Sequence, residues 1–369
     1  MRKVAVLFGG KSCENEISVL TGIFVMNVLD REKYTVIPVY VHTDGEMYTS
    51  PKMTDLQVFR EKKFDNFQRI FFYHGGMYAL NLQKNKIKRL ARIDVALNCC
   101  HGGLGEGGGV SAIMAWHGIP LASPDLTASG VFMDKSMTKI VMRALNIPTL
   151  DYIRVNERDY CRRGAFLLKN IGTRLKYPVV VKPAHLGSSI GITLASNEEE
   201  TKAALETVFA IDDRAVIEKY LAGKRDVNCA AYSLRGEIYV SEPEEAFGEG
   251  IYSFEDKYVR KESDFLKGGN RRALSDELRD KIRAYTKTVY KRMNLRGVVR
   301  MDFLVSGDKA YLCEVNTVPG SLAYYLFCER ISDARTFFSA LLEEAVENDG
   351  QNKKLLSTGI LKEVRFRQK

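Results

Sequence analysis

The segment from Gly297 to Gly320, GVVRMDFLVSGDKAYLCEVNTVPG, carries the strongest local pattern in this chain. Two apolar runs flank Ser306-Gly307-Asp308, which predicts a β-hairpin. Side chains along a strand alternate between its two faces, so Arg300 and Asp302 share one face of the first strand. The hairpin therefore presents a polar face whose composition depends on how its second strand is aligned.

Together with the first strand, the polar residues of the second strand would form a metal site if the loop between the strands has three residues. Glu314 and Asn316 share one face, and Cys313 points to the other. A three-residue loop would place Asp302 across from Glu314 and Arg300 across from Asn316, whereas a two-residue turn would put them on opposite faces. Two carboxylates and an amide oxygen are hard ligands suited to one or two magnesium ions. A solvated sheet face or a structural arginine-carboxylate pair is the alternative.

A second segment, Val179 to Gly191 (VVVKPAHLGSSIG), offers a place where phosphate could bind. A buried strand delivers Lys182, and the loop behind it contains Gly187, Ser188, Ser189 and Gly191. Backbone N–H groups and hydroxyls beside a cation suit an anion. The order of lysine and glycines differs from that of a Walker A loop, and a plain turn is the alternative.

The first 122 residues predict a parallel α/β domain. An apolar run at Lys3–Phe8 stops at Gly9-Gly10 and is followed by helical spacing over residues 17–29. Further buried strands are expected at residues 34–41 and 93–97. The alternation of Lys84, Lys86 and Lys88 is typical of a solvated strand face.

After Ser123-Pro124 the sequence pattern changes to helices followed by strands, so a second domain begins near residue 123. We expect a central domain over residues 123–214 and a C-terminal domain over residues 215–350. Helices are predicted at residues 125–132, 135–145 and around 278–289, and Ser196 with Glu199 resembles a capping box. The long polar segment 242–269 is typical of a mobile lid, and residues 351–369 form a basic tail.

Length and composition fit a globular protein with more than one core. The chain has 369 residues, of which 45% are hydrophobic, and chains of this length usually form two or three domains. The net charge is +9, but six basic residues and one acidic residue lie in the tail, so we expect no nucleic-acid partner. There is no run long enough for a membrane span. Seven cysteines without a CxxC pair favour a reducing cytoplasm over a disulfide framework.

Seven motifs together resemble the D-alanine:D-alanine ligase family of the ATP-grasp superfamily. They occur in the family's order from residue 4 to about residue 326. The motifs are GGKSCENEIS, HGGLGEGG, MDKSMTK, VKPAHLGSSIG, IEKYLAGKRDVN, YSFEDKY, and RMDFL with EVNTVPG. The resemblance implies a three-domain fold in which an N-terminal α/β domain precedes two antiparallel α+β domains that clamp ATP.

The resemblance also assigns roles to individual residues. The ATP contacts it implies are Lys135, Lys182, Glu218, Lys219, Leu221, Asp226 and Lys257. Magnesium, or manganese, would be held by Asp302, Glu314 and Asn316. Glu14, Ser188 and Tyr258 would form a triad that closes the lid over the substrate, and Glu14 would also hold the first amino acid. His101 would lie beside that amino acid, while Arg300 and the Gly320 N–H would face the oxyanion.

These residue types suit the formation of an amide from a carboxylate. A carboxylate is a poor acceptor for an amine, so phosphoryl transfer from ATP first makes an acylphosphate. The amine then attacks the activated carbonyl, and a lid keeps water away from the intermediate. The resemblance implies two D-alanines as substrates, peptidoglycan precursors as the destination, and a homodimer.

The sequence departs from the family pattern at the second substrate. Where the family continues with Met-Thr and a serine that binds the second carboxylate, this chain has Ser321 to Tyr325, and Tyr325 replaces the serine. Gly107 and Ser111 also replace polar residues of the family near the first subsite. A ligase with a different amino acceptor, a nucleotide-binding regulator without turnover, and a nucleic-acid binder using the basic tail are therefore the alternatives.

Overall fold

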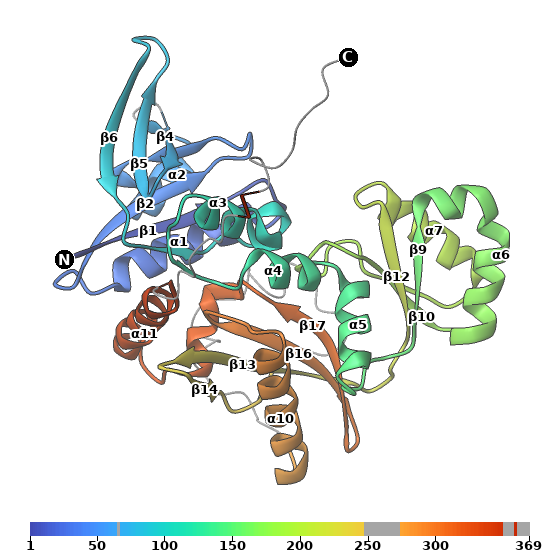
Figure 1. Cartoon of the computed structure of the whole chain (residues 1–369). Helices are drawn as coiled ribbons and strands as arrows, with labels where there is room; N and C mark the ends of the chain where they lie inside the picture. Colours follow the sequence, from blue (N-terminus) through green and yellow to red (C-terminus); the bar gives the residue numbers. More distant parts are fainter. Residues whose placement is uncertain (65–66, 247–273, 350–357, 360–369) are drawn as a thin grey trace.

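The computed structural model describes residues 1–64, 67–246, 274–349 and 358–359 (Figure 1). Within these residues the strands form three sheets. The first is built from the N-terminal residues, and the other two, which follow it in the sequence, are antiparallel. None of the helices in these ranges is long and apolar enough to cross a membrane. The predicted segment 242–269 is described only up to residue 246, and most of the predicted tail 351–369, as well as Lys257 and Tyr258, lies outside the described residues.

The N-terminal sheet has eight strands in the order β6-β5-β4-β3-β2-β1-β7-β8. The predicted parallel core consists of β1 (Arg2–Gly9), β2 (Tyr34–Val41), β7 (Val95–Asn98) and β8 (Leu121–Ala122). The other four strands extend it as antiparallel neighbours: β3 (Met47–Thr49), β4 (Gln68–Tyr73), β5 (Gly76–Asn81) and β6 (Lys86–Arg92). The connections β2–β3, β4–β5 and β5–β6 are short and form hairpins, whereas β3 and β4 are joined by the longer segment 50–67, and the sheet is mixed.

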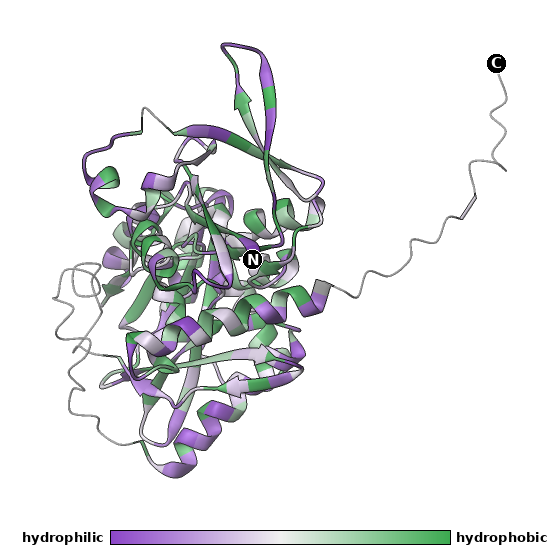
Figure 2. Ribbon diagram, turned by 90° about the vertical axis from the view of Figure 1, so that its left-hand side faces the viewer, coloured by the Kyte–Doolittle hydropathy of each residue, from purple (hydrophilic) through white to green (hydrophobic). Residues whose placement is uncertain are grey.

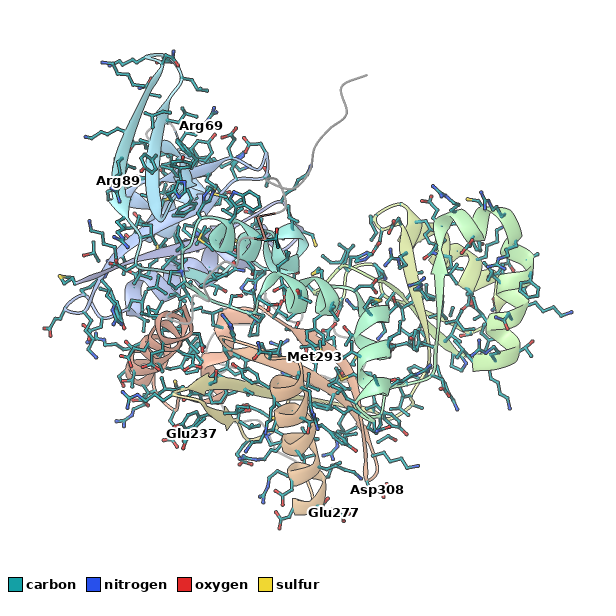
Figure 3. All side chains as sticks on the ribbon, viewed as in Figure 1. Arg69, Arg89, Glu237, Glu277, Met293 and Asp308 are labelled. Atoms are coloured by element: carbon teal, nitrogen blue, oxygen red, sulfur yellow. The ribbon has the colours of Figure 1, made fainter. Side chains whose placement is uncertain are left out.

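Strand β6 forms one edge of this sheet and projects from the body of the molecule in a hairpin with β5 (Figures 1 and 2). Its side chains from Lys86 to Arg89 are exposed, and Ile87 is 64% exposed. Figure 3 shows Arg89 on this hairpin. The predicted solvated strand face is confirmed here, although Lys84 lies in the turn before the strand.

Helices cover the N-terminal sheet and bring loops to the carboxyl ends of its parallel strands. They are α1 (Asn15–Val28), α2 (Leu56–Arg60) and α3 (Val110–Trp116), with a 3-10 turn η1 (Pro51–Thr54) and a π-helical turn η2 (Gly105–Gly109). The loop after β1 and the loop after β7 both begin at the same edge of the sheet, because the two strands are parallel neighbours.

The central sheet is antiparallel, with the order β11-β10-β12-β9. Its strands are β9 (Tyr152–Asn156), β10 (Val179–Pro183), β11 (Thr193–Ala195) and β12 (Arg214–Lys219), and α6 (Glu157–Leu175) and α7 (Glu198–Phe209) pack on it. The cap of α7 differs from the predicted one: Asn197 accepts from the Glu200 N–H, one residue later than the expected pair Ser196 and Glu199. Helix α6 was not predicted, because its buried apolar side chains occupy only its second half.

The C-terminal sheet has the order β14-β13-β16-β17, with β15 (Glu244–Glu245) beside β13. The strands are β13 (Arg225–Leu234), β14 (Glu237–Val240), β16 (Val299–Ser306) and β17 (Lys309–Asn316). The predicted helix α10 (Asp276–Arg292) covers this sheet, together with α4 (Leu126–Met133) and α5 (Lys135–Ala144). Thus α4 and α5 precede the central sheet in sequence but contribute to the core of the C-terminal one.

One hydrophobic core joins the N-terminal and C-terminal parts. Helix α11 (Ile331–Asp349), which was not predicted, and the irregular turn η3 (Gly320–Leu326) pack Phe338 and Leu322 against Val4 and Val25 of the first sheet and helix. The core of the central sheet, in contrast, is built from residues between Ile153 and Ile217. By strand pairing β12 also belongs to this central sheet, although the predicted division after residue 214 falls at its start.

Candidate active site

The β16–β17 hairpin aligns its polar residues through a bulge. Ser306 pairs with Lys309, so the loop has two residues, the length that by itself would put the polar residues of the two strands on opposite faces. The register shifts between Asp302 and Phe303, however, and Asp302 then pairs with Glu314. The bulge adds the residue that the turn lacks.

This bulge changes the position of Cys313 and confirms the pairing of the polar residues. Arg300 lies across from Asn316 and Asp302 across from Glu314, as the metal hypothesis requires. The sulfur of Cys313 lies 3.6 Å from the Lys182 Nζ of the central sheet, so the expectation that Cys313 faces away from the polar patch is wrong. A bulged strand turns two successive side chains toward one side.

Arg300, Asp302 and Asn316 form one hydrogen-bonded group. Arg300 donates from Nε to Asp302 Oδ1 at 2.7 Å and from Nη2 to Oδ2 at 2.9 Å. The Asn316 amide nitrogen donates to Asp302 Oδ2 at 3.0 Å. The nearby Asp302 carboxylate raises the pKa of Arg300 even though burial opposes this. The guanidinium is therefore a fixed positive charge beside the two carboxylates.

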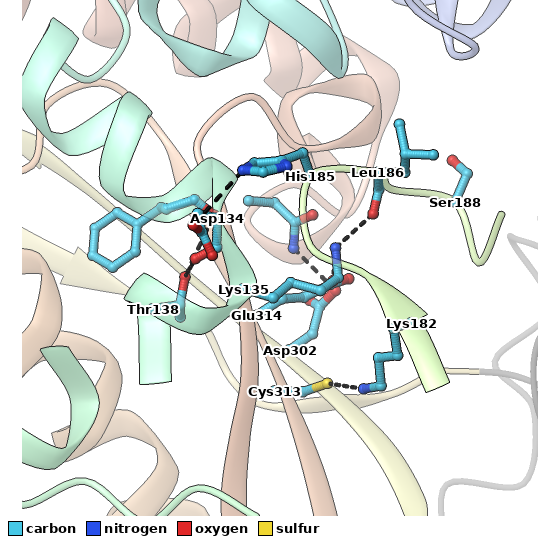
Figure 4. Close-up of polar contacts among 12 residues, drawn as sticks. Asp134, Lys135, Thr138, Lys182, His185, Leu186, Ser188, Asp302, Cys313 and Glu314 are labelled. Atoms are coloured by element: carbon cyan, nitrogen blue, oxygen red, sulfur yellow. Dashed lines mark hydrogen bonds and ion pairs between the residues drawn. The ribbon is translucent and has the colours of Figure 1, made fainter. Parts of the chain in front are cut away.

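Lys135 and Lys182 reach the same region from two different elements (Figure 4). Lys135, in the first turn of α5, donates to the Leu186 carbonyl at 2.5 Å and lies 3.6 Å from Glu314 Oε2. Asp134 caps that helix through the Ser136 and Met137 N–H groups, which fixes the position of Lys135. The loop after β10 is thus held next to the carboxylates of the hairpin.

A buried ion cluster lies between β10 and β12. Glu218 is 2% exposed and lies 2.7 Å from Lys139 Nζ and 2.5 Å from Lys182 Nζ. Burial acts against ionisation, but the two lysines outweigh it and hold the pKa of Glu218 at about 2. The pKa of Lys182 is raised despite burial by its acidic neighbours, including Cys313 and Glu218. Lys139 was missed in the sequence because a lysine within a helical pattern carries no sign of burial.

Glu14 and Ser188 lie together, as expected for two members of the triad. The Ser188 hydroxyl donates to Glu14 Oε1, and both residues are buried. A Cβ on Gly102 would lie 2.4 Å from Glu14 Oε2, and one on Gly187 would lie 2.8 Å from the same oxygen. Two glycines therefore leave just enough space for the carboxylate.

His101 and Glu106 come from the loop after β7. Burial lowers the pKa of His101 to about 4, so its imidazole is neutral at pH 7. Burial, with Glu14 nearby, raises the pKa of Glu106 to about 7. Glu106 was not singled out in the sequence; the π-helical turn that holds it, a form of helix common at functional sites, could not be read from the residues alone.

His185 is a further charged residue that the sequence did not reveal. Its Nδ1 lies 2.9 Å from Asp212 Oδ1 and its Nε2 3.7 Å from Asp134 Oδ2. Hydrogen bonds to Asp134 and Asp212 raise the pKa of His185 to about 9. An imidazolium therefore links the β10 loop to the cap of α5 (Figure 4).

The remaining predicted residues occupy the borders of this region. The Lys219 N–H donates to the Asp151 carbonyl at 3.1 Å, so it is already used within the central sheet, and Leu221 follows in the loop after β12. Asp226 forms an ion pair with Lys224. Gly320 and Ser321 begin η3, and the Tyr325 hydroxyl lies 3.2 Å from Arg300 Nη1.

The hairpin has a suitable donor set for magnesium. Asp302 and Glu314 keep 20% and 27% of their side-chain surface exposed, so an ion can reach them. Two carboxylates with an amide oxygen are the hard ligands that this ion prefers. In the described residues Arg300 forms an ion pair with Asp302 and Lys135 lies 3.6 Å from Glu314, so a positive side chain lies beside each carboxylate.

The three sheets, with Lys182 of the central sheet and Lys135 of α5 both reaching the hairpin of the C-terminal sheet, make this an ATP-grasp fold. A family model described as the N-terminus of D-ala D-ala ligase matches residues 3–124, and one described as its C-terminus matches residues 141–347. The D-alanine–D-alanine ligase of Thermosipho africanus is 34% identical over 333 residues, which cover 89% of this chain and 88% of that protein.

Solved structures agree with this match. The D-alanine–D-alanine ligase from Helicobacter pylori has a TM-score of 0.76 and 26% identity, covering 94% of this chain and 98% of its own. The VanG D-Ala:D-Ser ligase from Enterococcus faecalis shares the fold, with a TM-score of 0.74, 24% identity and coverage of 94% and 99%. The chain belongs to the D-alanine–D-alanine ligase family.

Proposed function

We propose that the protein is an ATP-dependent ligase that joins two D-amino acids, with D-alanine as the first substrate and D-alanyl-D-alanine for peptidoglycan as the leading product. The observation that carries this proposal is the meeting of two lysines with the β16–β17 hairpin, in which Asp302 pairs with Glu314. Lys135 lies 3.6 Å from Glu314 Oε2, and Lys182 lies 3.6 Å from the sulfur of the neighbouring Cys313. Membership in the family gives the reaction class. A soluble cytoplasmic homodimer is part of the proposal.

The first step in this proposal is phosphoryl transfer to the carboxylate of the first amino acid. Lys135 and Lys182 would attract the phosphates of ATP, and Glu14 would hold the ammonium group of the amino acid. Asp302, Glu314 and Asn316 would hold magnesium, which would supply a positive charge against the phosphate oxygens. The Ser188 hydroxyl donates to Glu14, which ties the loop after β10 to the N-terminal part, and in this proposal that loop would cover the first substrate.

The second step is attack by the amine of the second amino acid. Arg300 and the Gly320 N–H would stabilise the oxyanion of the tetrahedral intermediate, a contribution worth about 3–4 kcal/mol in other enzymes. Because two nitrogens on one edge of the Arg300 guanidinium already donate to Asp302, the group is held in one orientation. The phosphate then leaves as the amide forms.

The identity of the second substrate depends on Tyr325. A family serine at this position would be short, whereas the Tyr325 phenol reaches Arg300. A small D-amino acid other than D-alanine, such as D-serine, is therefore the second candidate acceptor, consistent with a D-Ala:D-Ser ligase that shares the fold.

The proposal is tested by measuring ADP release with purified protein, ATP and magnesium against a panel of D- and L-amino acids, with product identification by mass spectrometry. D-alanine alone should release ADP and give a dipeptide. ADP release that no amino acid increases would contradict the proposal and favour a binding or regulatory protein.

A further inference from the structure

A closed ring of hydrogen bonds ties the segment after Asn316 to the N-terminal part. The Ser321 N–H lies 3.3 Å from Thr21 Oγ1, and Thr21 Oγ1 lies 2.8 Å from His101 Nε2. The other imidazole nitrogen, His101 Nδ1, lies 2.7 Å from the Val318 carbonyl oxygen. Thr21 of α1 and His101 of the loop after β7 thus connect the Ser321 N–H to the Val318 carbonyl, and the backbone between these two residues closes the ring.

The direction of every bond in this ring follows from one atom. A carbonyl oxygen can only accept, so His101 Nδ1 carries the proton and donates to Val318. The neutral imidazole then has a lone pair on Nε2, which accepts from the Thr21 hydroxyl. The Thr21 oxygen in turn accepts from the Ser321 N–H. Each group uses one donor and one acceptor, and such chains of bonds strengthen one another in a buried place.

The ring holds a turn that residues with side chains seldom adopt. Ser321, Leu322 and Ala323 have φ values of 50°, 51° and 49°, all in the left-handed region, and none of them is glycine. Such a conformation costs about 1–2 kcal/mol for each residue. Leu322 and Ala323 are buried at 3% and 0% exposure, so packing offsets part of that cost. The hydrogen bond from Ser321 to Thr21 lies at the start of the turn.

Glu106 adds a second tether on the same segment. Its Oε1 accepts from the Val318 N–H at 3.1 Å, and its Oε2 accepts from the Gly102 N–H at 2.8 Å. The two polar groups of Val318 are therefore both bound by side chains of the N-terminal part: the N–H by Glu106 and the carbonyl by His101. Val318 lies between the Asn316 amide and the Gly320 N–H.

We propose that Thr21 and Glu106 are positioning residues that hold residues 318–323 in the left-handed turn, and so fix the wall against which the second amino acid binds. This inference rests on the proposed function for its kinetic consequence. Turn η3 carries Tyr325 two residues after the left-handed stretch, and Tyr325 contacts Arg300. A shift of the turn would therefore move the acceptor side of the site while leaving the lysines of the ATP side in place.

The test uses Thr21→Val, which keeps the shape of the side chain and removes the hydroxyl. The Michaelis constant for the second amino acid should rise at least about fivefold, since one hydrogen bond is worth about 1 kcal/mol, while those for ATP and the first amino acid stay unchanged. Thr21→Ser restores a hydroxyl and should recover most of the loss. Thr201→Val, which removes a buried hydroxyl from α7 in the central domain, is the matched control and should change none of the three constants.

Glu106→Gln tests the second tether. The amide has a single acceptor oxygen, so its nitrogen must face one of the two N–H donors, and the same Michaelis constant should rise by a similar factor. A variant that changes only the melting temperature, or that raises all three constants together, would overturn the positioning role. Equal kinetics in Thr21→Val and wild type would do the same.

Hydrogen exchange supplies a readout that does not depend on the reaction. Peptides covering residues 317–326 should exchange faster in Thr21→Val and Glu106→Gln than in wild type, and normally in Thr201→Val. Unchanged exchange would refute the inference even if the protein is a ligase. Faster exchange with no ligase activity in wild type would keep the tether and refute the proposed function instead.

Discussion

Glu314 is the residue on which the metal proposal depends most directly. Glu314→Gln keeps the size of the side chain but removes its charge, so magnesium-dependent ADP formation should fall below about a tenth of wild type because a lost ligand charge costs several kcal/mol. The fold should remain intact, since this partly exposed carboxylate is not part of the core. Circular dichroism and the ADP assay together check this expectation.

Asp308 offers a matched control for that substitution. It lies at the tip of the same hairpin, exposed and far from the polar patch (Figure 3). Asp308→Asn removes an equal charge and should leave turnover unchanged. Folded Glu314→Gln protein with wild-type turnover would contradict a role for this carboxylate in metal binding.

Tyr325 is the residue that should set acceptor choice. Tyr325→Ser shortens the side chain and removes the phenol hydroxyl 3.2 Å from Arg300 Nη1. The relative rates with which different D-amino acids are used as the second substrate should therefore change. Tyr325→Phe keeps the ring and should weaken binding of the second amino acid about fivefold, the effect of one hydrogen bond. Product analysis with competing acceptors measures both changes. If Tyr325→Ser leaves the profile as it was, the acceptor carboxylate must be bound elsewhere, with Ser321 as the next residue to test.

The single residues also separate what the sequence could and could not predict. Alternation predicted that Arg300 shares a face with Asp302 and that Glu314 shares one with Asn316, because strand periodicity is local information, but whether the two faces coincide depended on the loop and the bulge. Lys139, Glu106 and Thr21 were not found, since their importance comes from burial and from partners that are distant in the chain. Glu14 was identified only through the family resemblance.

At the scale of elements, the loop after β10 is held to α5 by charge. The raised pKa of His185 means that its contribution to stability is complete below about pH 6.5 and is lost as the pH rises through about 9. The lowered pKa values of Asp134 and Asp212 have the opposite sign, because their contribution is lost as the pH falls through those lowered values. Arg214 also contacts Asp134, so one cation remains there at high pH.

His185→Gln should therefore destabilise the protein at pH 7 and much less at pH 10. The expected loss at pH 7 is about 1 kcal/mol after screening by solvent, since a third of the side chain is exposed. Urea unfolding of variant and wild type at both pH values measures it. A difference that is the same at pH 7 and pH 10 would mean that packing rather than ionic contacts is responsible.

The element scale also shows why the register of the hairpin could be only half predicted. The pairing of Asp302 with Glu314 was expected from a three-residue loop, and it arises instead from a two-residue loop with a bulge. Both arrangements place Asp302 across from Glu314 and Arg300 across from Asn316. They differ in the side of the strand on which Cys313 lies. Helix α6 was missed because polar residues interrupt its apolar spacing, and α11 was not predicted either.

At the scale of the whole molecule, the distribution of cores predicts two units of stability. Phe338 is fully buried in the core shared by the N-terminal and C-terminal parts, and Ile171 is fully buried in the core of the central sheet. Phe338→Leu and Ile171→Val should each cost about 1 kcal/mol. The first should speed hydrogen exchange in β1 and η3, and the second in β10 and β12.

Exchange that rises everywhere in both variants would show that the molecule unfolds as one unit. The domain divisions proposed from the sequence would then have no counterpart in stability. If the two patterns separate, the central sheet can move relative to a rigid remainder, and substrate access between β10 and β17 would follow from that motion.

Strand β6 limits how copies of this protein can meet. An uncovered strand edge has unpaired N–H and C=O groups that can pair with a strand of another chain. The exposed side chains of Lys86, Lys88, Arg89 and Arg92 would bring like charges together if two such edges met. These charges therefore disfavour a homodimer formed through β6, and we expect the proposed homodimer to use a different surface.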